Sequence, residues 1–199
     1  MNFELLVATN NAHKLTEIRQ ILSPHHITVY GMKDLNIDIG EVEENGKNYY
    51  ENALIKATAL KKVTKMPIIA DDSGLEILAL NNAPGLHSAR FASSLGGHAN
   101  AINKILEDLK DLDRSARFIC DIVLVNVEDK PLLFEGIVPG KIGLAPEGNT
   151  GFGYDPIFVC DELNKCYALL SQEEKNRVSH RGKALKKLLT YLKINGYAD

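Results

Sequence analysis

Four polar or glycine-rich regions follow short apolar runs in this chain of 199 residues. In α/β proteins such runs form buried strands, and ligands bind outside the strand ends. These regions are therefore candidates for binding and chemistry. They are residues 9–14, the acidic stretches 41–44 and 71–72, residues 151–156 and residues 175–181.

The first segment, Thr9-Asn10-Asn11-Ala12-His13-Lys14, joins an expected strand to an expected helix. The N-terminus of a helix presents free N–H groups and a partial positive charge, which suit a phosphate. The side chains of Thr9 and Asn11 can add hydrogen bonds, and Lys14 can add a charge. The segment lacks the pattern of an ordinary phosphate loop. The alternative is a surface helix capped by Asn10 or Asn11.

The acidic residues Glu41 to Glu44 and Asp71-Asp72 are candidate metal ligands. Magnesium prefers hard oxygen ligands, often one or two carboxylates together with substrate phosphates and water. Two adjacent acids directly after an apolar run repel each other unless a cation or a donor compensates. The alternative is a polar turn in which Asp72 caps a helix.

The segment Gly151-Phe152-Gly153-Tyr154-Asp155-Pro156 is suited to a flat ligand. Its glycines let the backbone approach closely, and Phe152 can stack on a base. Asp155 can accept a hydrogen bond from a base edge. The alternative is an isolated turn with packed aromatic side chains.

The basic segment, residues 175–181, contains Lys175, Arg177, His180 and Arg181 at the expected start of the last helix. A cation at a helix N-terminus opposes the helix dipole. His180 and Arg181 therefore favour a role in binding an electron-rich partner over a role in stability, and a solvated basic face is the alternative. Together the four regions predict a nucleotide site.

Strands and helices alternate in the elements that must position these segments. Short, β-branched apolar runs predict strands, and apolar residues at helical spacing predict helices. The expected strands are residues 3–8, 27–30, 67–70 (ending at Asp71), 118–127 and 132–138, the last two joined as a hairpin by residues 128–131. The expected helices run from Asn10 or Asn11 to Leu22 and over residues 49–63, 99–109 and 181–195. We expect one α/β domain covering residues 1–199.

The bulk properties restrict the partners and the compartment. A net charge of -3 argues against general binding to nucleic acid or to an anionic membrane. Cys120, Cys160 and Cys166 are odd in number and form no C-x-x-C pair, so we expect neither a disulfide framework nor a structural zinc. The N-terminus lacks a signal-peptide pattern, and no stretch reaches the ~20 apolar residues of a membrane span. We expect a cytoplasmic protein.

Six ordered motifs resemble those of the inosine triphosphate pyrophosphatase family, also called HAM1-like or dITP/XTP pyrophosphatases. The resemblance extends over nearly the whole chain, and six motifs in order are far more specific than one. They are residues 8–14 (ATNNAHK), 51–57 (ENALIKA), 71–75 (DDSGL), 84–91 (PGLHSARF), 151–158 (GFGYDPIF) and 179–185 (SHRGKAL).

The resemblance implies a mixed α/β fold with a long central sheet, flanking helices and two lobes around a deep cleft, usually as a homodimer. It implies magnesium-dependent hydrolysis of ITP, dITP and XTP to the monophosphate and pyrophosphate. Thr9, Asn10, Asn11, Ala12, His13 and Lys14 would hold the phosphates, with Lys56 and Ser73 beside them. Glu44 and Asp72 would bind Mg²⁺, and Asp72 would also accept a proton. Phe152, Gly153, Tyr154, Asp155, Lys175, His180 and Arg181 would form the base pocket.

Two other functions stay open. A Maf-like pyrophosphatase acting on dTTP or UTP would share the architecture, and a panel of triphosphates separates the two. A non-catalytic nucleotide-binding protein would bind ITP without releasing pyrophosphate. The presence of Asp72 with Glu44 and Lys14 argues against this second alternative.

Overall fold

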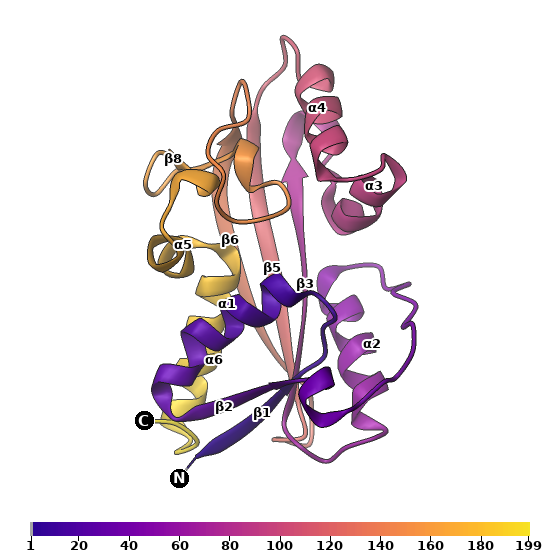
Figure 1. The fold of residues 1–199 in the computed structure, drawn as a ribbon, viewed down its shortest axis with the longest axis vertical. Coiled ribbons are helices and arrows are strands. Elements are labelled where there is room, and N and C mark those ends of the chain that lie inside the picture. Colours follow the sequence, from indigo (N-terminus) through magenta and orange to yellow (C-terminus); the bar gives the residue numbers. More distant parts are fainter. Residues whose placement is uncertain (1) are drawn as a thin grey trace. The chain divides into compact units, whose positions relative to one another are not determined.

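The computed structural model describes residues 2–199, which form one mixed sheet and flanking helices (Figure 1). Along the sheet the strand order is β2-β1-β3-β5-β6-β7-β8, and β4 pairs with β3. β1 pairs in parallel with β2 and β3, whereas the β3–β4, β6–β7 and β7–β8 pairs are antiparallel. The predicted mixed α/β class is confirmed.

The strands are β1 (Phe3–Val7), β2 (Ile27–Gly31), β3 (Ile68–Ile77), β4 (Ala83–Pro84), β5 (Ser115–Val125), β6 (Leu132–Ile142), β7 (Phe158–Cys160) and β8 (Lys165–Cys166). The α-helices are α1 (Ala12–Leu22), α2 (Tyr49–Lys61), α3 (Ser88–Ser94), α4 (His98–Asp108), α5 (Gln172–Val178) and α6 (His180–Ile194). No helix among residues 2–199 has the length and apolar character needed to cross a membrane.

The chain divides into two compact units. Unit 1 contains the residues up to Asp72 together with Cys120–Gly136 and Arg181–Asp199. Unit 2 contains Ser73–Ile119 and Ile137–His180. β3, β5 and β6 therefore contribute residues to both units.

Unit 1 has a hydrophobic cluster on each face of its strands. On one face, residues of β1, β3 and β5 pack against α1 and α6, with Ile18 and Leu188 among the buried side chains. On the other face, residues of the same strands pack against α2 through Ala53, Ala57 and Leu60. Strand side chains alternate between the two faces. Neighbouring residues of β3 and β5 in unit 1 therefore meet different helices.

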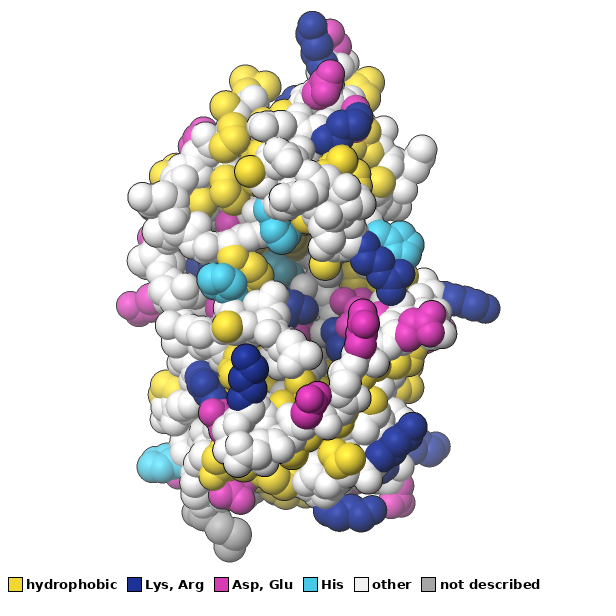
Figure 2. All heavy atoms as spheres, turned by 45° about the vertical axis from the view of Figure 1, so that its right-hand side comes forward, with side chains coloured by type: hydrophobic (Ala, Val, Ile, Leu, Met, Phe, Trp, Pro, Cys, Tyr) yellow, Lys and Arg dark blue, Asp and Glu magenta, His cyan; other side chains and the backbone are white. Residues whose placement is uncertain are grey.

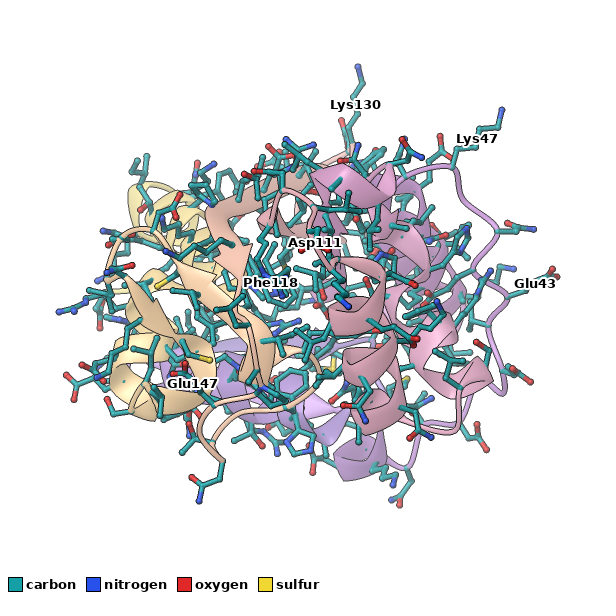
Figure 3. The ribbon with its side chains drawn as sticks, turned by 90° about the horizontal axis from the view of Figure 1, so that it is seen from above. Glu43, Lys47, Asp111, Phe118, Lys130 and Glu147 are labelled. Carbon is teal, nitrogen blue, oxygen red and sulfur yellow. The ribbon has the colours of Figure 1, made fainter. Side chains whose placement is uncertain are left out.

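Unit 2 has a single hydrophobic cluster that includes α4 residues and aromatic side chains. Phe118 of β5 lies in the interior (Figure 3), where its ring stacks against His180 with centroids 4.4 Å apart.

In the same view the charged side chains of Lys130, Glu43 and Lys47 extend outward from loops. Charged side chains of both signs are interspersed on the face shown in Figure 2.

Most of the expected elements are present, with two corrections. The strand expected to end at Asp71 instead continues to Ile77, because the buried carboxylates of Asp71 and Asp72 accept hydrogen bonds from Arg181 and Asn52. The basic segment begins the last helix only in part: His180 and Arg181 start α6, as expected, but the residues before them do not belong to it. Lys175 and Arg177 lie on the separate helix α5, whose N-cap is Ser171, and the chain is extended at Ser179 before α6 begins. The structure also adds α3, β4, β7 and β8, which sequence periodicity did not indicate.

Candidate functional site

Asp71 and Asp72 of β3 point to opposite faces of the sheet. Asp71 lies on the face of Ile69, toward α1 and α6, and Asp72 lies on the face of Ala70, toward α2. Both carboxylates are buried, with relative exposures of 2% and 8%. The strand therefore gives two adjacent acids two separate environments.

Three cationic groups surround Asp71. Its Oδ2 accepts from Nε and Nη2 of Arg181 at 3.2 and 3.1 Å and lies 3.0 Å from Nζ of Lys14. Its backbone carbonyl oxygen accepts from Nζ of Lys56 at 2.6 Å. Burial would raise the pKa of the Asp71 carboxyl, but the charges of Lys14, Arg181 and Lys56 hold that pKa below its usual range. Asp71 is therefore ionised throughout the neutral range.

The negative charge of Asp72 is less well compensated by nearby cations and donors than that of Asp71. Its Oδ2 accepts from Nδ2 of Asn52 on α2 at 3.1 Å. Burial raises the pKa of the Asp72 carboxyl, Lys56, Lys14 and the Asn52 hydrogen bond lower it, and the charge of Glu44 raises it again, with a net increase. Adjacent acids whose pKa values are displaced in opposite directions are typical of acid–base assignments in active sites.

Lys56 connects these groups from α2. Besides donating to the Asp71 carbonyl, its Nζ lies 2.9 Å from Oε1 of Glu44, which is 31% exposed. Burial lowers the pKa of Lys56, but the nearby acids Asp71, Asp72 and Glu44 raise it above its ordinary value. Lys56 is therefore charged, and its ammonium lies among three acidic residues.

The segment 9–14 turns from β1 into α1. Oγ1 of Thr9 accepts from the backbone N–H of Asn11 at 3.1 Å, and Oδ1 of Asn11 accepts from the N–H groups of His13 and Lys14 at 3.0 and 3.2 Å. Asn11 is thus the N-cap of α1, as one of the two expected caps. Asn10, Ala12 and His13 are exposed in this turn, where a ligand can reach them.

The residues around Asp72 suit a hard divalent cation in their chemistry. Asp72 and Glu44 offer carboxylate oxygens, and the charge of each acts on Lys56. Within the same residues no cluster of three His, Cys, Asp or Glu side chains is preformed. Magnesium binds through one or two carboxylates plus substrate phosphates, so two protein carboxylates are a sufficient set.

Unit 2 holds the glycine-rich segment around a buried ion pair. Oδ2 of Asp155 lies 2.6 Å from Nζ of Lys175 on α5 and accepts from the N–H of Phe152 at 2.8 Å. The same ammonium lies 4.6 Å from the centroid of the Phe152 ring, a cation–π contact. Gly151 has φ +76°, and a Cβ there would overlap the Asp155 carboxylate. The segment is therefore a built turn with one aromatic face and one internal charge pair.

Other expected base-pocket residues have structural contacts in unit 2. The hydroxyl of Tyr154 donates to the backbone oxygen of Ser88 at 2.6 Å, and burial raises its pKa to about 12. His180 stacks on Phe118, and Tyr167 lies parallel to both rings. Gly153 has φ +66° and lies against the ring of His98. Ser73, which was expected beside the phosphates, is half-buried in β3, directly after Asp72.

A model of the Ham1 family matches residues 5–191. The chain belongs to the Ham1 family. It is 42% identical to a dITP/XTP pyrophosphatase from Clostridium perfringens over 199 residues, which covers 96% of this chain and 97% of the relative. It is 44% identical to one from Shigella flexneri over 195 residues, or 96% and 98% of the two chains. The solved structure of a HAM1 protein from Coxiella burnetii matches with a TM-score of 0.84 at 40% identity, covering 96% and 99%.

Within this Ham1 family chain, Lys14, Lys56, Asp72, Glu44 and Arg181 all belong to unit 1. The guanidinium of Arg181 is buried, and it pairs with Asp71 and with Glu17 of α1. Its assignment to base recognition stays a prediction. Phe152, Gly153, Tyr154, Asp155 and Lys175 form one group in unit 2, and His180 lies in the aromatic cluster with Phe118.

The sequence did not single out Glu17, Asn52 and Asp121, although each contacts or faces a site group. Glu17 pairs with Arg181, and Asn52 bonds Asp72. Asp121 interrupts the apolar run of residues 118–125, and a lone acid inside a predicted buried strand is a signal that could have identified it.

Proposed function

We propose that this chain hydrolyses ITP, dITP and XTP to the nucleoside monophosphate and pyrophosphate as a single catalytic domain. The observation that carries the proposal is the different surroundings of two adjacent buried acids: Arg181 and Lys14 contact the Asp71 carboxylate, whereas Asp72 accepts a hydrogen bond from Asn52. The pKa of the Asp71 carboxyl is accordingly lowered and that of Asp72 is raised. A carboxylate with raised proton affinity is suited to general-base chemistry near neutral pH. The relatives named dITP/XTP pyrophosphatase support the choice of substrate.

In the proposed reaction Asp72 accepts a proton from water. The water oxygen forms a bond to the α-phosphorus, and the bond from that phosphorus to the oxygen bridging to the β-phosphorus breaks. The electron pair leaves on pyrophosphate. Asn52 orients the Asp72 carboxylate through the 3.1 Å hydrogen bond from its Nδ2.

Lys14 and Lys56 bind the triphosphate in this proposal, with Thr9 to His13 at the start of α1 and Ser73 completing the phosphate contacts. Both ammonium groups already lie beside Asp71, at its carboxylate and its carbonyl. Fixed cations stabilise charge that develops on a leaving group because they need little reorganisation. Asp71 thus sets the position of the two lysines.

Mg²⁺ held by Asp72 and Glu44 is the cofactor we infer, and when bound it would neutralise charge on the phosphates. The oxygen-only donor set supports this assignment, because Mg²⁺ binds through one or two carboxylates together with substrate phosphates and water.

For the base, we propose that Phe152 stacks on the purine and that the Gly151–Asp155 turn, Lys175 and His180 complete the pocket. Asp155 and Lys175 neutralise each other at 2.6 Å, so they present a fixed dipole. Arg181 remains a proposed reader of a 6-oxo group, because a guanidinium donates only. In this role its guanidinium would have to exchange contacts with Glu17 or Asp71 for the base.

We also propose a cytoplasmic location and a homodimer. Cys120, Cys160 and Cys166 are buried and unbonded to one another, which suits a reducing compartment. Light scattering tests the dimer.

Phosphorus NMR of the purified protein with ITP and Mg²⁺ tests the activity. We expect inosine monophosphate and pyrophosphate without inosine diphosphate. Orthophosphate as the first product would contradict the proposed bond cleavage. Pyrophosphate release across ITP, XTP, dITP, ATP, GTP, dTTP and UTP separates this function from that of a Maf-like enzyme. Binding of ITP without release would identify a non-catalytic binding protein.

A further inference from the structure

Asp121 is an acid in the middle of an apolar buried strand. In β5 its relative exposure is 6%, and both neighbours, Cys120 and Ile122, are fully buried. A carboxylate in such a position loses hydration that an apolar residue would not need. We therefore expect the Asp121 carboxylate to make an interaction that offsets its lost hydration.

Strand alternation places Asp121 on the face covered by α2. Cys120 and Ile122 belong to the cluster that packs against α1 and α6. Val123 and Val125 belong to the cluster that packs against α2. Asp121 shares the face of Val123 because side chains two residues apart in a strand point the same way. Asp72 lies on this face too, on the neighbouring strand β3.

The carboxylate of Asp121 accepts a hydrogen bond from the backbone N–H of Tyr50, the second residue of α2. The first N–H groups of a helix have no partner within the helix, and they carry a partial positive charge. Asn48 caps the same end through its side chain, which accepts from Glu51 at 2.8 Å. Asn48 precedes the helix in the chain, whereas Asp121 belongs to the sheet. Asp121 therefore ties the start of α2 to the strands beneath it.

The part of α2 that follows carries two groups of the site. Asn52 comes two residues after Tyr50 and bonds Asp72, and Lys56 comes one turn later and bonds the Asp71 carbonyl. Their donor–acceptor distances of 3.1 and 2.6 Å depend on where the helix begins over the sheet. Hydrogen bonds weaken steeply as such distances grow.

We propose that Asp121 is a positioning residue for the reaction: by holding the first turn of α2 against the sheet, it places Asn52 against Asp72 and Lys56 against Asp71. The inference rests on the proposed function for its kinetic consequences. That Asp121 holds α2 against the sheet does not depend on the proposed function.

The charge environment of Asp121 is consistent with a role that needs an acceptor rather than a charge. Burial raises its pKa to about 6, with further contributions from the charges of Glu135 and Asp72 and an opposing one from the Tyr50 N–H. Its Oδ1 is buried with no hydrogen-bond partner among residues 2–199. An amide in its place keeps the acceptor and removes the buried charge.

Three variants test the proposal: Asp121→Ala, Asp121→Asn and the control Ile122→Val on the opposite face of the same strand. Each is assayed with ITP and Mg²⁺ at the same interval below its own Tm. We expect Asp121→Ala to lower kcat about 10- to 100-fold with a smaller change in KM, since small misplacements of catalytic groups have effects of this size. Asp121→Asn should restore kcat to within about threefold, and Ile122→Val should keep it, because α2 stays in place in both.

Amide hydrogen exchange of α2 gives a readout without substrate. Loss of one hydrogen bond should speed exchange at Tyr50 about tenfold in Asp121→Ala and leave it near wild type in Asp121→Asn. Normal kcat in Asp121→Ala, or an equal loss in Asp121→Asn, would overturn the positioning role. A wild-type protein that does not cleave ITP would contradict the proposed function instead, and the exchange data would still decide whether Asp121 holds α2.

Discussion

Arg181 and Glu17 form a buried ion pair in which Nη1 of Arg181 lies 2.6 Å from Oε2 of Glu17, although 164 residues separate them in the chain. The other side of the same guanidinium donates twice to Asp71, and the Arg181 side chain is only 2% exposed. One cation thus ties α1, β3 and α6 together and helps to keep Asp71 ionised.

Replacing Arg181 with Ala should therefore destabilise the fold. It leaves the carboxylates of Glu17 and Asp71 buried without their guanidinium, and breaking a buried pair in this way typically costs about 3–5 kcal/mol. Urea unfolding measures the loss, and Arg177→Ala, an exposed arginine of α5, is the matched control and should change stability by less than about 0.5 kcal/mol. If Arg181 also reads the base, kcat/KM should fall more for ITP than for ATP. An equal fall for both would exclude that role.

Asp72→Asn and Asp71→Asn should have different consequences. The first removes the proposed proton acceptor and should lower kcat by about three orders of magnitude. It should not lower Tm, because the Asp72 carboxyl has a raised pKa and its charge is unfavourable in the fold at neutral pH. Asp71→Asn should lower Tm, because it removes a charge that Lys14 and Arg181 stabilise. Pyrophosphate release and thermal melts check both, and near-normal turnover in Asp72→Asn would rule out the proposed mechanism.

Lys175→Met should weaken both stability and the use of ITP. Met retains most of the side-chain volume but leaves Asp155 buried without its cation, at a cost of about 3–5 kcal/mol. The proposed base pocket would also lose the contact to Phe152, so KM for ITP should rise. The control is Lys165→Met. The Lys165 side chain is 44% exposed, and its Nζ lies 3.9 Å from Oε1 of Glu174, so this surface ion pair contributes little to stability. Equal effects of the two substitutions would contradict a special role for Lys175.

Asp121 should make stability pH-dependent in a defined window. The pKa of Asp121 in the folded protein is about 6, above the ordinary value of 3.8. The protonated carboxyl therefore contributes to the free energy of unfolding in full below pH 3.8, and this contribution is lost as the pH rises through about 6. Asp121→Asn abolishes this dependence. From acid to neutral pH, the free energy of unfolding of the variant should rise relative to that of wild type by roughly 1–3 kcal/mol, since one pKa unit corresponds to about 1.4 kcal/mol. Urea unfolding at pH 4.5, 5.5, 6.5 and 7.5 measures the difference, and a constant difference would contradict the predicted titration.

The sequence by itself determined the fold class, most of the elements and the family. The apolar periodicities predicted β1, α1, β2, α2 and α4 to within a few residues, because each element buries a regular face. Six motifs indicated the Ham1 family, which the family model and the relatives confirm. The Asn11 cap could also be predicted, since it depends only on residues next to it in the chain.

Only the tertiary structure decided what each polar residue contacts. Asp71 and Asp72 look like one acidic pair in the sequence, but β3 continues through them and its alternation directs them to different helices. Glu17 and Arg181 meet only through the packing of α1 and α6 around β3, and Asp121 meets Tyr50 only through the packing of α2 on β5. Such long-range contacts follow from how helices and strands stack, and local sequence patterns carry no record of that stacking.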